Sequence, residues 1–371
     1  MPYRVVQWAT GNVGRHALAG LDAHPELELV GLFVSNPAKV GTDAGELAGL
    51  GRRLGVAGSS DVDALLALEP DCIVHTAMAD DRLGEALADL ERFLSAGINV
   101  VSSGPVFLQY PQPDDPMAGP LIAAAQKAGV SLFVNGIDPG FANDALPLVL
   151  SGISERIDEV RCSEVLNYNT YNQPMVLFDI MGFGRDLHDV PMLLSPGVFT
   201  MAWGSVVRQI ADGLGIALTD ITEWYEREAA PEDFEVAAGT IKQGTAAALH
   251  FEVRGMVGDK PVVVLEHVTR LRDDLGADWP QPAGQGCYRI AITGEPNYTV
   301  DLQLMGTDGD HNTAGLKATA MRLVNAVPAV VAAPPGLVTA LDLPLITGRG
   351  LVVTGRSDEK PDRNGKRSRA G

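Results

Sequence analysis

Hydrophobic and polar positions follow two different patterns along the chain. Up to Leu150, short continuous apolar runs alternate with segments whose apolar residues recur at helical spacing, as they do from Leu83 to Leu94. Continuous apolar strands separated by amphipathic helices are typical of a parallel sheet covered on both faces. The pattern predicts a doubly wound α/β domain over residues 1–145. Its expected strands are Arg4–Trp8, Leu29–Val34, Leu54–Val56, Asp71–Thr76, Asn99–Ser102 and Ser131–Asn135.

Beyond that point the apolar runs are longer, and several alternate with a period of two. Gly258 and Asp259 join two of these runs as a hairpin turn. Meandering strands with few helices between them predict a C-terminal α+β domain over residues 146–311, with a mostly antiparallel sheet. The expected strands are Val160–Leu166, Ala246–Val257, Lys260–Leu271, Cys287–Thr293 and Tyr298–Met305, and the expected helices are Val198–Leu214 and Asn312–Val327.

The composition is that of a globular protein and narrows the choice of partners. The chain of 371 residues is 46% hydrophobic, and 28 Lys and Arg against 47 Asp and Glu give a net charge of −19. So acidic a surface repels phosphate backbones and anionic lipids, which argues against binding to nucleic acid or to a membrane. The three cysteines are widely spaced, and no basic and apolar leader precedes the first strand. We expect a cytoplasmic protein whose polar residues 356–371 are disordered.

The first turn of the parallel domain carries the signal of a dinucleotide site. The motif A-T-G-N-V-G, from Ala9 to Gly14, lies between the first strand and the first helix, and it matches G-x-G-x-x-G with Ala9 in place of the first glycine. Gly11 would let the backbone approach a pyrophosphate, which the helix N-terminus would bind, and Gly14 would let the helix pack closely on the sheet. A structural turn is the alternative. The predicted cofactor-binding residues are Thr10, Gly11, Asn12, Val13 and Gly14.

The end of the second strand indicates which dinucleotide binds. Sites for NAD usually place Asp or Glu there to bind the ribose hydroxyls. Here Ser35 and Asn36 follow the strand, Lys39 comes soon after, and no acid occurs before Asp43. Hydroxyl, amide and ammonium groups donate to a ribose phosphate, so NADP is favoured over NAD. The same residues also fit a simple turn.

Further candidates follow the later strands, because ligands of doubly wound sheets lie beyond the carboxyl ends of the strands. Asn135 and Asp138, after the sixth strand, could face a substrate, although Asp138 before Pro139 also fits turn chemistry alone. The residues expected on the nicotinamide side are Thr76, Ala77, Ser102, Ser103 and Gly104.

The second domain contributes polar groups on otherwise apolar strands. Tyr168 lies in a run of hydrogen-bonding residues at a strand end, where a phenol could donate a proton, and a polar loop is the alternative. His267 shares a strand face with Leu265 and Thr269, and it is either a substrate-facing group or a satisfied structural histidine. A set of aromatic and Met side chains suits either a small apolar pocket or the core. This set is Phe141, Met175, Phe178, Met181, Phe183 and Phe199.

Two other kinds of chemistry find little support in the sequence. The seven histidines are scattered, with no H-x-x-x-H or H-x-H pair, so no metal site is predicted. No G-x-S-x-G elbow occurs, which argues against a serine hydrolase.

Together, four motifs resemble the dihydrodipicolinate reductase-like superfamily, and more narrowly its branch of 2,4-diaminopentanoate dehydrogenase and native amine dehydrogenases. These motifs are Ala9–Gly14, Lys39–Gly45, Gly136–Phe141 and Met181–Gly184. The resemblance implies an N-terminal Rossmann domain, a C-terminal α+β domain with most of the substrate pocket, a last helix (about residues 312–350) that returns to the first domain, and a homodimer. It also implies that a histidine from the segment of His267 lies near the substrate.

One departure from the family bears on the chemistry. The amine dehydrogenases bind the ammonium or iminium group with a glutamate just after the fifth strand, and the matching stretch here, Ser102–Phe107, has no acid. Either another carboxylate serves, with Asp138, Glu164 and Asp179 as candidates, or the substrate is not an iminium.

The resulting expectation is an oxidoreductase that uses NADP, or NAD, and acts as an amine dehydrogenase on small ketones or aldehydes with ammonia, and in reverse. The predicted catalytic residues are Asn135, Asp138, Tyr168 and His267. The alternatives are a carbonyl or imine reductase that does not use ammonia, and a protein that binds NADP without catalysis.

Overall fold

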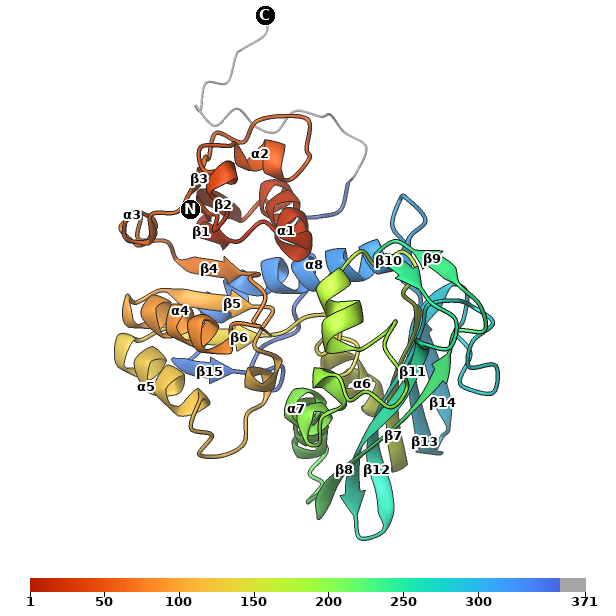
Figure 1. Ribbon diagram of the computed structural model, residues 1–371. Helices are drawn as coiled ribbons and strands as arrows, with labels where there is room; N and C mark the ends of the chain where they lie inside the picture. Colours follow the sequence, from red (N-terminus) through yellow and green to blue (C-terminus); the bar gives the residue numbers. More distant parts are fainter. Residues whose placement is uncertain (80, 354–371) are drawn as a thin grey trace, which may run out of the picture.

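Two sheets organise the chain in the computed structural model, which describes residues 1–79 and 81–353 (Figure 1). The first sheet has seven strands, all parallel, in the order β15-β6-β5-β4-β1-β2-β3. These strands are β1 (Tyr3–Trp8), β2 (Leu27–Phe33), β3 (Gly58–Ser59), β4 (Cys72–His75), β5 (Asn99–Ser102), β6 (Ser131–Val134) and β15 (Gly336–Val338).

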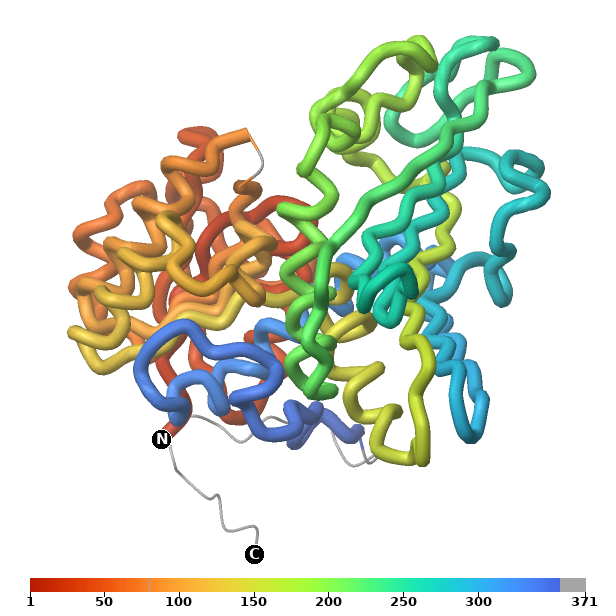
Figure 2. Tube along the Cα trace, turned by 90° about the horizontal axis from the view of Figure 1, so that it is seen from below, coloured from red at the N-terminus to blue at the C-terminus, as the bar shows by residue number. Residues whose placement is uncertain are grey.

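Helices cover both faces of this sheet, because its central strands are buried on both sides. α4 (Leu83–Ser95) and α5 (Ala118–Ala128) pack against one face. α1 (Asn12–Ala23) and α8 (His311–Val331) contact each other and pack against the other face. α8 therefore carries the chain from the end of the second sheet back to the first, where β15 adds the outermost strand beside β6 (Figures 1 and 2).

The second sheet has six strands in the order β14-β13-β7-β12-β11-β8. Neighbouring strands are antiparallel except for the central pair β7 and β12, which is parallel. The strands are β7 (Arg156–Asn167), β8 (Asp220–Ala229), β11 (Ala246–Val257), β12 (Lys260–Arg270), β13 (Gly286–Glu295) and β14 (Tyr298–Leu302), with a separate hairpin of β9 (Phe234–Val236) and β10 (Gly239–Ile241).

α7 (Val198–Gly213) lies between the two sheets (Figures 1 and 2). It packs on β11 and β12 and also contacts η2 (Val106–Gln109), which follows the first sheet's β5. The remaining helical segments are α2 (Ala44–Leu47), α3 (Val62–Leu66), α6 (Ala145–Ser151), the 3₁₀ turns η1 (Pro37–Lys39) and η4 (Met192–Leu194), and the π-helical η3 (Met175–Ile180).

The predicted fold class is confirmed, with differences in single elements. The third strand lies at Gly58–Ser59 rather than at residues 54–56, and the edge strand β8 was not predicted. α8 continues through Pro328 for about another turn, because Val327 and Val330 remain in the core. The domain limits at residues 145 and 311 stay a prediction, and the predicted disorder of residues 356–371 lies outside the described residues.

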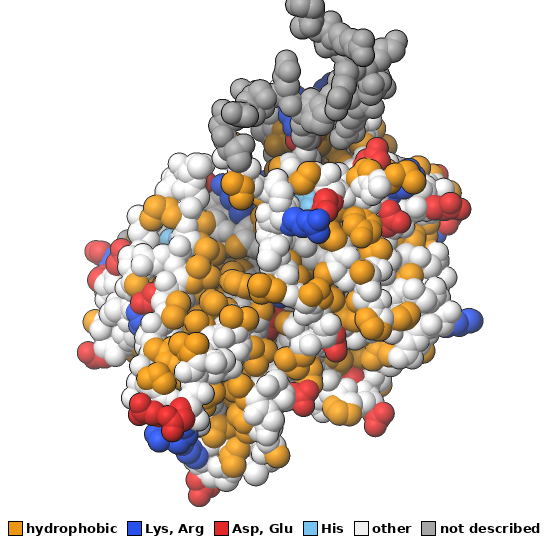
Figure 3. Space-filling model, turned by 180° about the vertical axis from the view of Figure 1, so that it is seen from behind, with side chains coloured by type: hydrophobic (Ala, Val, Ile, Leu, Met, Phe, Trp, Pro, Cys, Tyr) orange, Lys and Arg blue, Asp and Glu red, His pale blue; other side chains and the backbone are white. Residues whose placement is uncertain are grey.

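Acidic side chains are spread over the surface. On the face seen in Figure 3, hydrophobic side chains gather toward the middle and Asp and Glu lie mostly toward the edges, while Lys and Arg of the described residues are scattered. That face offers no broad basic area to a phosphate backbone. No helix in the described part of the chain combines the length and hydropathy needed to cross a bilayer.

Candidate active site

The turn after β1 has the backbone geometry of a dinucleotide-binding loop. Ala9 has a φ of 76°, the left-handed conformation that a glycine adopts without strain, so the turn keeps its shape although the first glycine is absent. A Cβ atom at Gly14 would lie 2.3 Å from the carbonyl oxygen of Ala9, whereas one at Gly11 would meet nothing within 4 Å. Gly14 is thus required for close packing of α1, and Gly11 leaves an open approach to the helix N-terminus. The first turn of α1 holds no acid and no side-chain cap that would compete with an anion.

The end of β2 presents no free acid. Ser35 and Asn36 are exposed, and Lys39 Nζ donates to Thr10 Oγ1 at 3.0 Å, which holds its ammonium group beside the turn. Asp43, the first acid after the strand, is buried and accepts three backbone N–H groups of its own loop. The carboxylate of Asp43 is therefore already fully engaged in structure.

A cavity of about 540 Å³ lies where the carboxyl ends of the parallel strands face the second sheet. It brings together seven of the predicted cofactor residues and three of the four predicted catalytic residues. On the side of the first sheet these are Gly11, Asn12, Val13, Thr76, Ala77, Ser103, Gly104 and Asp138, and on the side of the second sheet Tyr168 and His267.

The other predicted residues lie outside the cavity wall. Ser102 is buried beneath the strand ends, with its Oγ 2.9 Å from Nδ1 of His75. Asn135 donates to Asp144 at 2.6 Å and accepts from Arg322 at 2.8 Å, and this buried group ties the end of β6 to α8. The remaining ones, at the turn and the end of β2, are Thr10, Gly14, Ser35, Asn36 and Lys39.

Two carboxylates and an imidazole form the polar part of the cavity. His267 Nε2 lies 3.3 Å from Asp138 Oδ1, without the alignment of a hydrogen bond, and His267 Nδ1 lies 3.6 Å from Glu164 Oε1. The parallel register of β7 and β12 places Glu164 beside His267. Tyr168 donates to Glu164 at 2.8 Å, and the indole Nε1 of Trp203 donates to Asp138 Oδ1 at 3.1 Å. Each carboxylate therefore accepts a hydrogen bond from at least one neutral side chain, and both flank the imidazole.

The two carboxylates hold His267 in its charged form. Burial lowers the pKa of an imidazole, but Asp138 and Glu164 outweigh burial and raise the pKa of His267 to about 10. Burial, followed by the charge of Glu164, raises the pKa of Tyr168 and of Tyr288 well above the usual value for a phenol. At neutral pH the imidazole of the cluster is thus charged and both phenols are neutral.

Several wall residues were not predicted from the sequence. Trp203 of α7 and Phe251 of β11 both line the cavity, and the ring of His267 stacks on Phe251 with centroids 4.7 Å apart. Of the predicted apolar pocket only Met181 lines this space, whereas Phe183 and Phe199 belong to the core under α7. Helical and strand periodicity marks all of these side chains as inward-facing, which does not separate a cavity wall from a core.

Of the three acids considered as replacements for the missing glutamate, Asp138 and Glu164 border the cavity and Asp179 does not. Asp179 lies at the surface, where it forms an ion pair with Arg185 at 2.9 Å.

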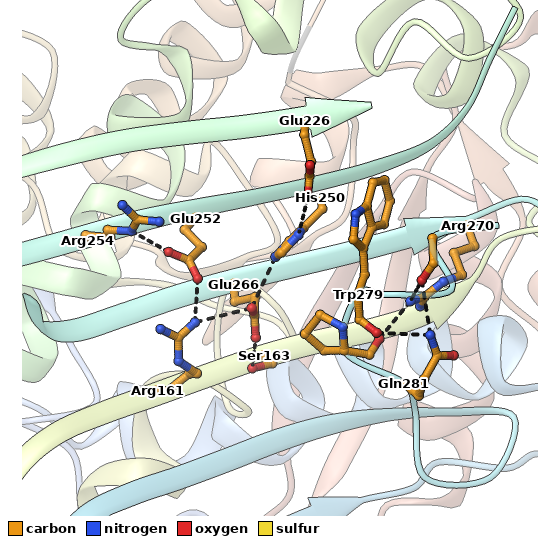
Figure 4. Close-up of polar contacts among 12 residues, drawn as sticks. Arg161, Ser163, Glu226, His250, Glu252, Arg254, Glu266, Arg270, Trp279 and Gln281 are labelled. Atoms are coloured by element: carbon orange, nitrogen blue, oxygen red, sulfur yellow. Dashed lines mark hydrogen bonds and ion pairs between the residues drawn. The ribbon is translucent and has the colours of Figure 1, made fainter. Parts of the chain in front are cut away.

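A second polar cluster occupies the opposite face of the same sheet (Figure 4). Arg161 Nη1 lies 2.6 Å from Glu252 Oε1 and 3.2 Å from Glu266 Oε1. Glu266 also accepts from Ser163 at 2.6 Å and lies 3.1 Å from His250 Nε2. Burial would raise the pKa of Glu266, but these hydrogen bonds and the charge of Arg161 outweigh it and lower the pKa to about 2. Arg254 also pairs with Glu252, so both buried acids of this cluster contact a guanidinium, and the cluster serves structure.

The two-sheet architecture with a glycine turn and a cavity at the strand ends defines the class of a nucleotide-dependent oxidoreductase. A solved amine dehydrogenase from Mycobacterium smegmatis has the same fold, with a TM-score of 0.75 and 24% identity over 94% of this chain and 97% of that one.

The family follows from closer likenesses. The model of the 2,4-diaminopentanoate dehydrogenase C-terminal domain matches residues 141–354. An amine dehydrogenase of Streptomyces virginiae is 43% identical over 348 residues, which are 92% of this chain and 96% of that protein. A 2,4-diaminopentanoate dehydrogenase of Acetoanaerobium sticklandii is 26% identical over 254 residues, 67% of each chain. The chain belongs to this family of dehydrogenases, which confirms the resemblance and the enzyme class predicted from the sequence.

Proposed function

We propose that this protein is an amine dehydrogenase that uses a nicotinamide dinucleotide, NADP in preference to NAD, to convert small ketones or aldehydes and ammonia into primary amines, and the reverse. One observation carries the proposal. The glycine turn and the strand ends form one side of the cavity, and Glu164 and His267 lie on the other side. Asp138 lies between the two sides. Membership of the family supports the same reaction class.

The residues present fit the cofactor. The diphosphate would lie against the open face of Gly11 and the N-terminus of α1, and the nicotinamide would lie near Thr76, Ala77, Ser103 and Gly104. The exposed Ser35 and Asn36 and the ammonium group of Lys39 suit a ribose phosphate, while the buried Asp43 offers no acceptor to ribose hydroxyls. When bound, this cofactor supplies or accepts the hydride.

The protein's side chains would act by stabilising the positive charge that the substrate carries during the reaction. In the direction of amination, a carbonyl compound, ammonia, NADPH and a proton give an amine, NADP⁺ and water. The intermediate that receives hydride is an iminium cation, and a nearby carboxylate stabilises it relative to the neutral carbonyl. The high pKa of His267 keeps an acid at the site whose proton could assist the loss of water.

The test is a comparison of NADPH oxidation by a small aliphatic ketone with and without ammonium. We expect turnover that requires ammonium and yields the amine. Turnover to an alcohol without ammonium would instead identify a carbonyl reductase. NADPH binding without turnover across a panel of carbonyl compounds and amines would identify a non-catalytic NADP-binding protein.

The cofactor preference has its own measurement. If Lys39 and the exposed residues after β2 bind the ribose phosphate, Lys39→Ala raises KM for NADPH several-fold and leaves KM for NADH nearly unchanged. Equal effects on both cofactors would indicate that Lys39 supports the turn alone.

A homodimer and a cytoplasmic location complete the proposal. α7 covers one face of the second sheet, and on the other face Trp224 remains 39% exposed, which suits a two-fold contact between copies. The three cysteines are buried and unpaired, as is usual in a reducing compartment. Light scattering after gel filtration should give twice the chain mass of 39.2 kDa, and Trp224→Glu should return the monomer.

A further inference from the structure

The cavity carries one negative charge more than its own groups neutralise. Among the described residues that line it, Asp138 and Glu164 are the acids, and no Lys or Arg is present. His267 supplies one positive charge between the two carboxylates. The polar atoms of these three side chains lie within 4.8 Å of one another, so a single cation in the cavity would face all of them.

The two carboxylates differ in how far they are already occupied. Glu164 accepts the hydroxyl of Tyr168, and Tyr288, directly opposite on β13, is a second phenol at the same carboxylate. At Asp138, the contacts from Trp203 and His267 both reach Oδ1. Oδ2 has no hydrogen-bond donor among the described residues, so Asp138 has an oxygen available for a ligand.

The positions of Asp138 and Glu164 in the fold differ as well. Glu164 belongs to the second sheet, whereas Asp138 follows β6 of the nucleotide-binding sheet. The segments after β4, β5 and β6 all contribute to the same cavity wall, through Thr76, Ser103 and Asp138. The nicotinamide of a doubly wound domain lies at these strand ends. Asp138 is therefore the carboxylate nearer to the place where hydride is exchanged.

We infer that Asp138 binds the nitrogen of the substrate amine and of its iminium ion, and that the substrate is a primary amine with apolar substituents and no carboxylate. The assignment rests on the proposed dehydrogenase function. In this chain the acid that binds the iminium then lies in the loop after β6, and not in the segment after β5, which contains no acid.

The rest of the cavity decides the substituents. Apart from the cluster, its hydroxyl neighbours and the amide of Gln173, the wall on the side of the second sheet is apolar and includes Ile180, Met181, Leu193, Ala202 and Phe251. A carboxylate on the substrate would find no cation except His267, which Asp138 and Glu164 already share, and it would add a negative charge beside Asp138, which is costly in a desolvated site. Alkyl or aryl groups would instead bury apolar surface.

The chemistry of oxidation fits this placement. As the C–H electron pair leaves the neutral amine as hydride, the nitrogen lone pair forms the C=N bond and the nitrogen becomes positively charged. The amine and NADP⁺ give the iminium ion and NADPH, and water then releases the ketone and ammonium. Positive charge thus develops next to Asp138 in the transition state, where a fixed carboxylate lowers the barrier.

The first test measures binding without turnover. tert-Butylammonium has no hydrogen on the carbon that bears nitrogen and cannot be oxidised, and tert-butanol is its neutral counterpart. By isothermal titration we expect wild-type protein to bind the ammonium at least about tenfold more tightly than the alcohol. Asp138→Asn should remove this preference, Glu164→Gln should reduce it about threefold, and the exposed control Asp179→Asn should leave it unchanged.

Equal affinities for the ion and the alcohol in wild-type protein would overturn the inference whether or not the variants fold. So would an undiminished preference in Asp138→Asn, or binding of Zn²⁺ at the three side chains that excludes the alkylammonium ion.

The second test addresses the substituents with sec-butylamine and α-aminobutyrate, which differ by a methyl group replaced by a carboxylate. We expect oxidation of the amine and a kcat/KM for the amino acid at least about a hundredfold lower. Comparable rates would overturn the substrate class. If tert-butylammonium binds through Asp138 but no amine or ketone is turned over, the proposed function fails and the cation site stands. If ammonium-dependent turnover occurs and Asp138→Asn keeps the wild-type preference, the function stands and the assignment fails.

Discussion

Adjacent residues of β7 and β12 enter two different polar clusters on opposite faces of one sheet. Glu164 and His267 point into the cavity beside α7, whereas Ser163 and Glu266 point to the far face. Strand geometry alone produces this division, because successive side chains alternate between faces. Both clusters contain buried acids and a histidine, and in both the polar atoms are close enough to reach a common ion.

The clusters differ in how their charges are matched. On the far face the guanidinium of Arg161 contacts both Glu252 and Glu266, and Arg254 also pairs with Glu252, so each of these two buried acids contacts an arginine (Figure 4). The cavity has no arginine among its described wall residues, and one carboxylate remains in excess. Buried acids and histidines therefore do not by themselves mark a binding site. A binding site is marked instead by a charge that has no partner and borders a cavity.

The largest expected effect separates the two clusters by activity. Asp138→Asn removes the unmatched charge and should lower kcat/KM for sec-butylamine by roughly a hundredfold to a thousandfold, as expected for loss of a group that stabilises developing charge. Glu252→Gln neutralises an acid of the far face and should leave kcat/KM within about twofold, because it touches no part of the cavity. Steady-state kinetics well below the unfolding temperature measures both. Similar losses in the two variants would show that the far cluster also shapes the site.

The next largest effect distinguishes the two clusters by their contribution to the free energy of unfolding. Arg161→Met leaves the buried Glu266 without a guanidinium and Glu252 with Arg254 alone, and breaking such a buried pair costs about 3 kcal/mol of unfolding free energy. The KM for amine in the folded fraction should stay at the wild-type value. Urea denaturation followed by circular dichroism gives the free energy. A loss below about 1 kcal/mol would mean that the far cluster is solvated like an ordinary surface network.

The two clusters also respond to pH in opposite directions. The pKa of Glu266 is lowered to about 2 from 4.5, so its stabilising contribution is present above pH 4.5 and is lost as the pH falls toward 2. The pKa of His267 is raised from 6.5 to about 10, so its contribution is complete below pH 6.5 and is lost as the pH rises through 10. Thermal unfolding between pH 3 and pH 10 should show both slopes. Glu266→Gln should flatten only the acid limb, and His267→Gln only the alkaline limb.

The sequence was sufficient where one segment determines its own structure. Five strands of the first sheet, β1, β2, β4, β5 and β6, were predictable because apolar runs such as Cys72–His75 are buried on both faces, whereas the short edge strands β3 and β15 were misplaced or missed. Gly11 and Gly14 were predictable from local spacing, although nothing local announced that Ala9 would adopt a left-handed φ. β8 escaped prediction because it is an edge strand with charged side chains and only partial burial, so its apolar signal is weak.

The site could be predicted only in part, because its contacts join distant segments. Alternation along β12 placed His267 on the correct face but could not name its partners. Asp138 reaches it from the loop after β6, and Trp203 arrives on α7, whose apolar stripe is indistinguishable in sequence from a core-facing one. Asn135, in contrast, was predicted to face the substrate but is buried outside the cavity. A polar residue at a strand end can equally satisfy a buried network, here with Asp144 and Arg322.

The smallest expected effect compares two hydroxyl groups that donate to buried carboxylates, one on each face. Tyr168→Phe removes the donor to Glu164 and Ser163→Ala removes the donor to Glu266, from bonds of 2.8 and 2.6 Å. Each loss should cost about 1 kcal/mol, since a hydrogen bond to a charged group is replaced by nothing. If the far face serves structure alone, Ser163→Ala lowers only the unfolding free energy. Because Glu164 faces the cavity, Tyr168→Phe should also change KM for amine by about threefold to fivefold, as the freed carboxylate draws the cation away from Asp138. Parallel measurement of both quantities in both variants is decisive, and a KM effect of Ser163→Ala as large as that of Tyr168→Phe would remove the distinction between the two faces.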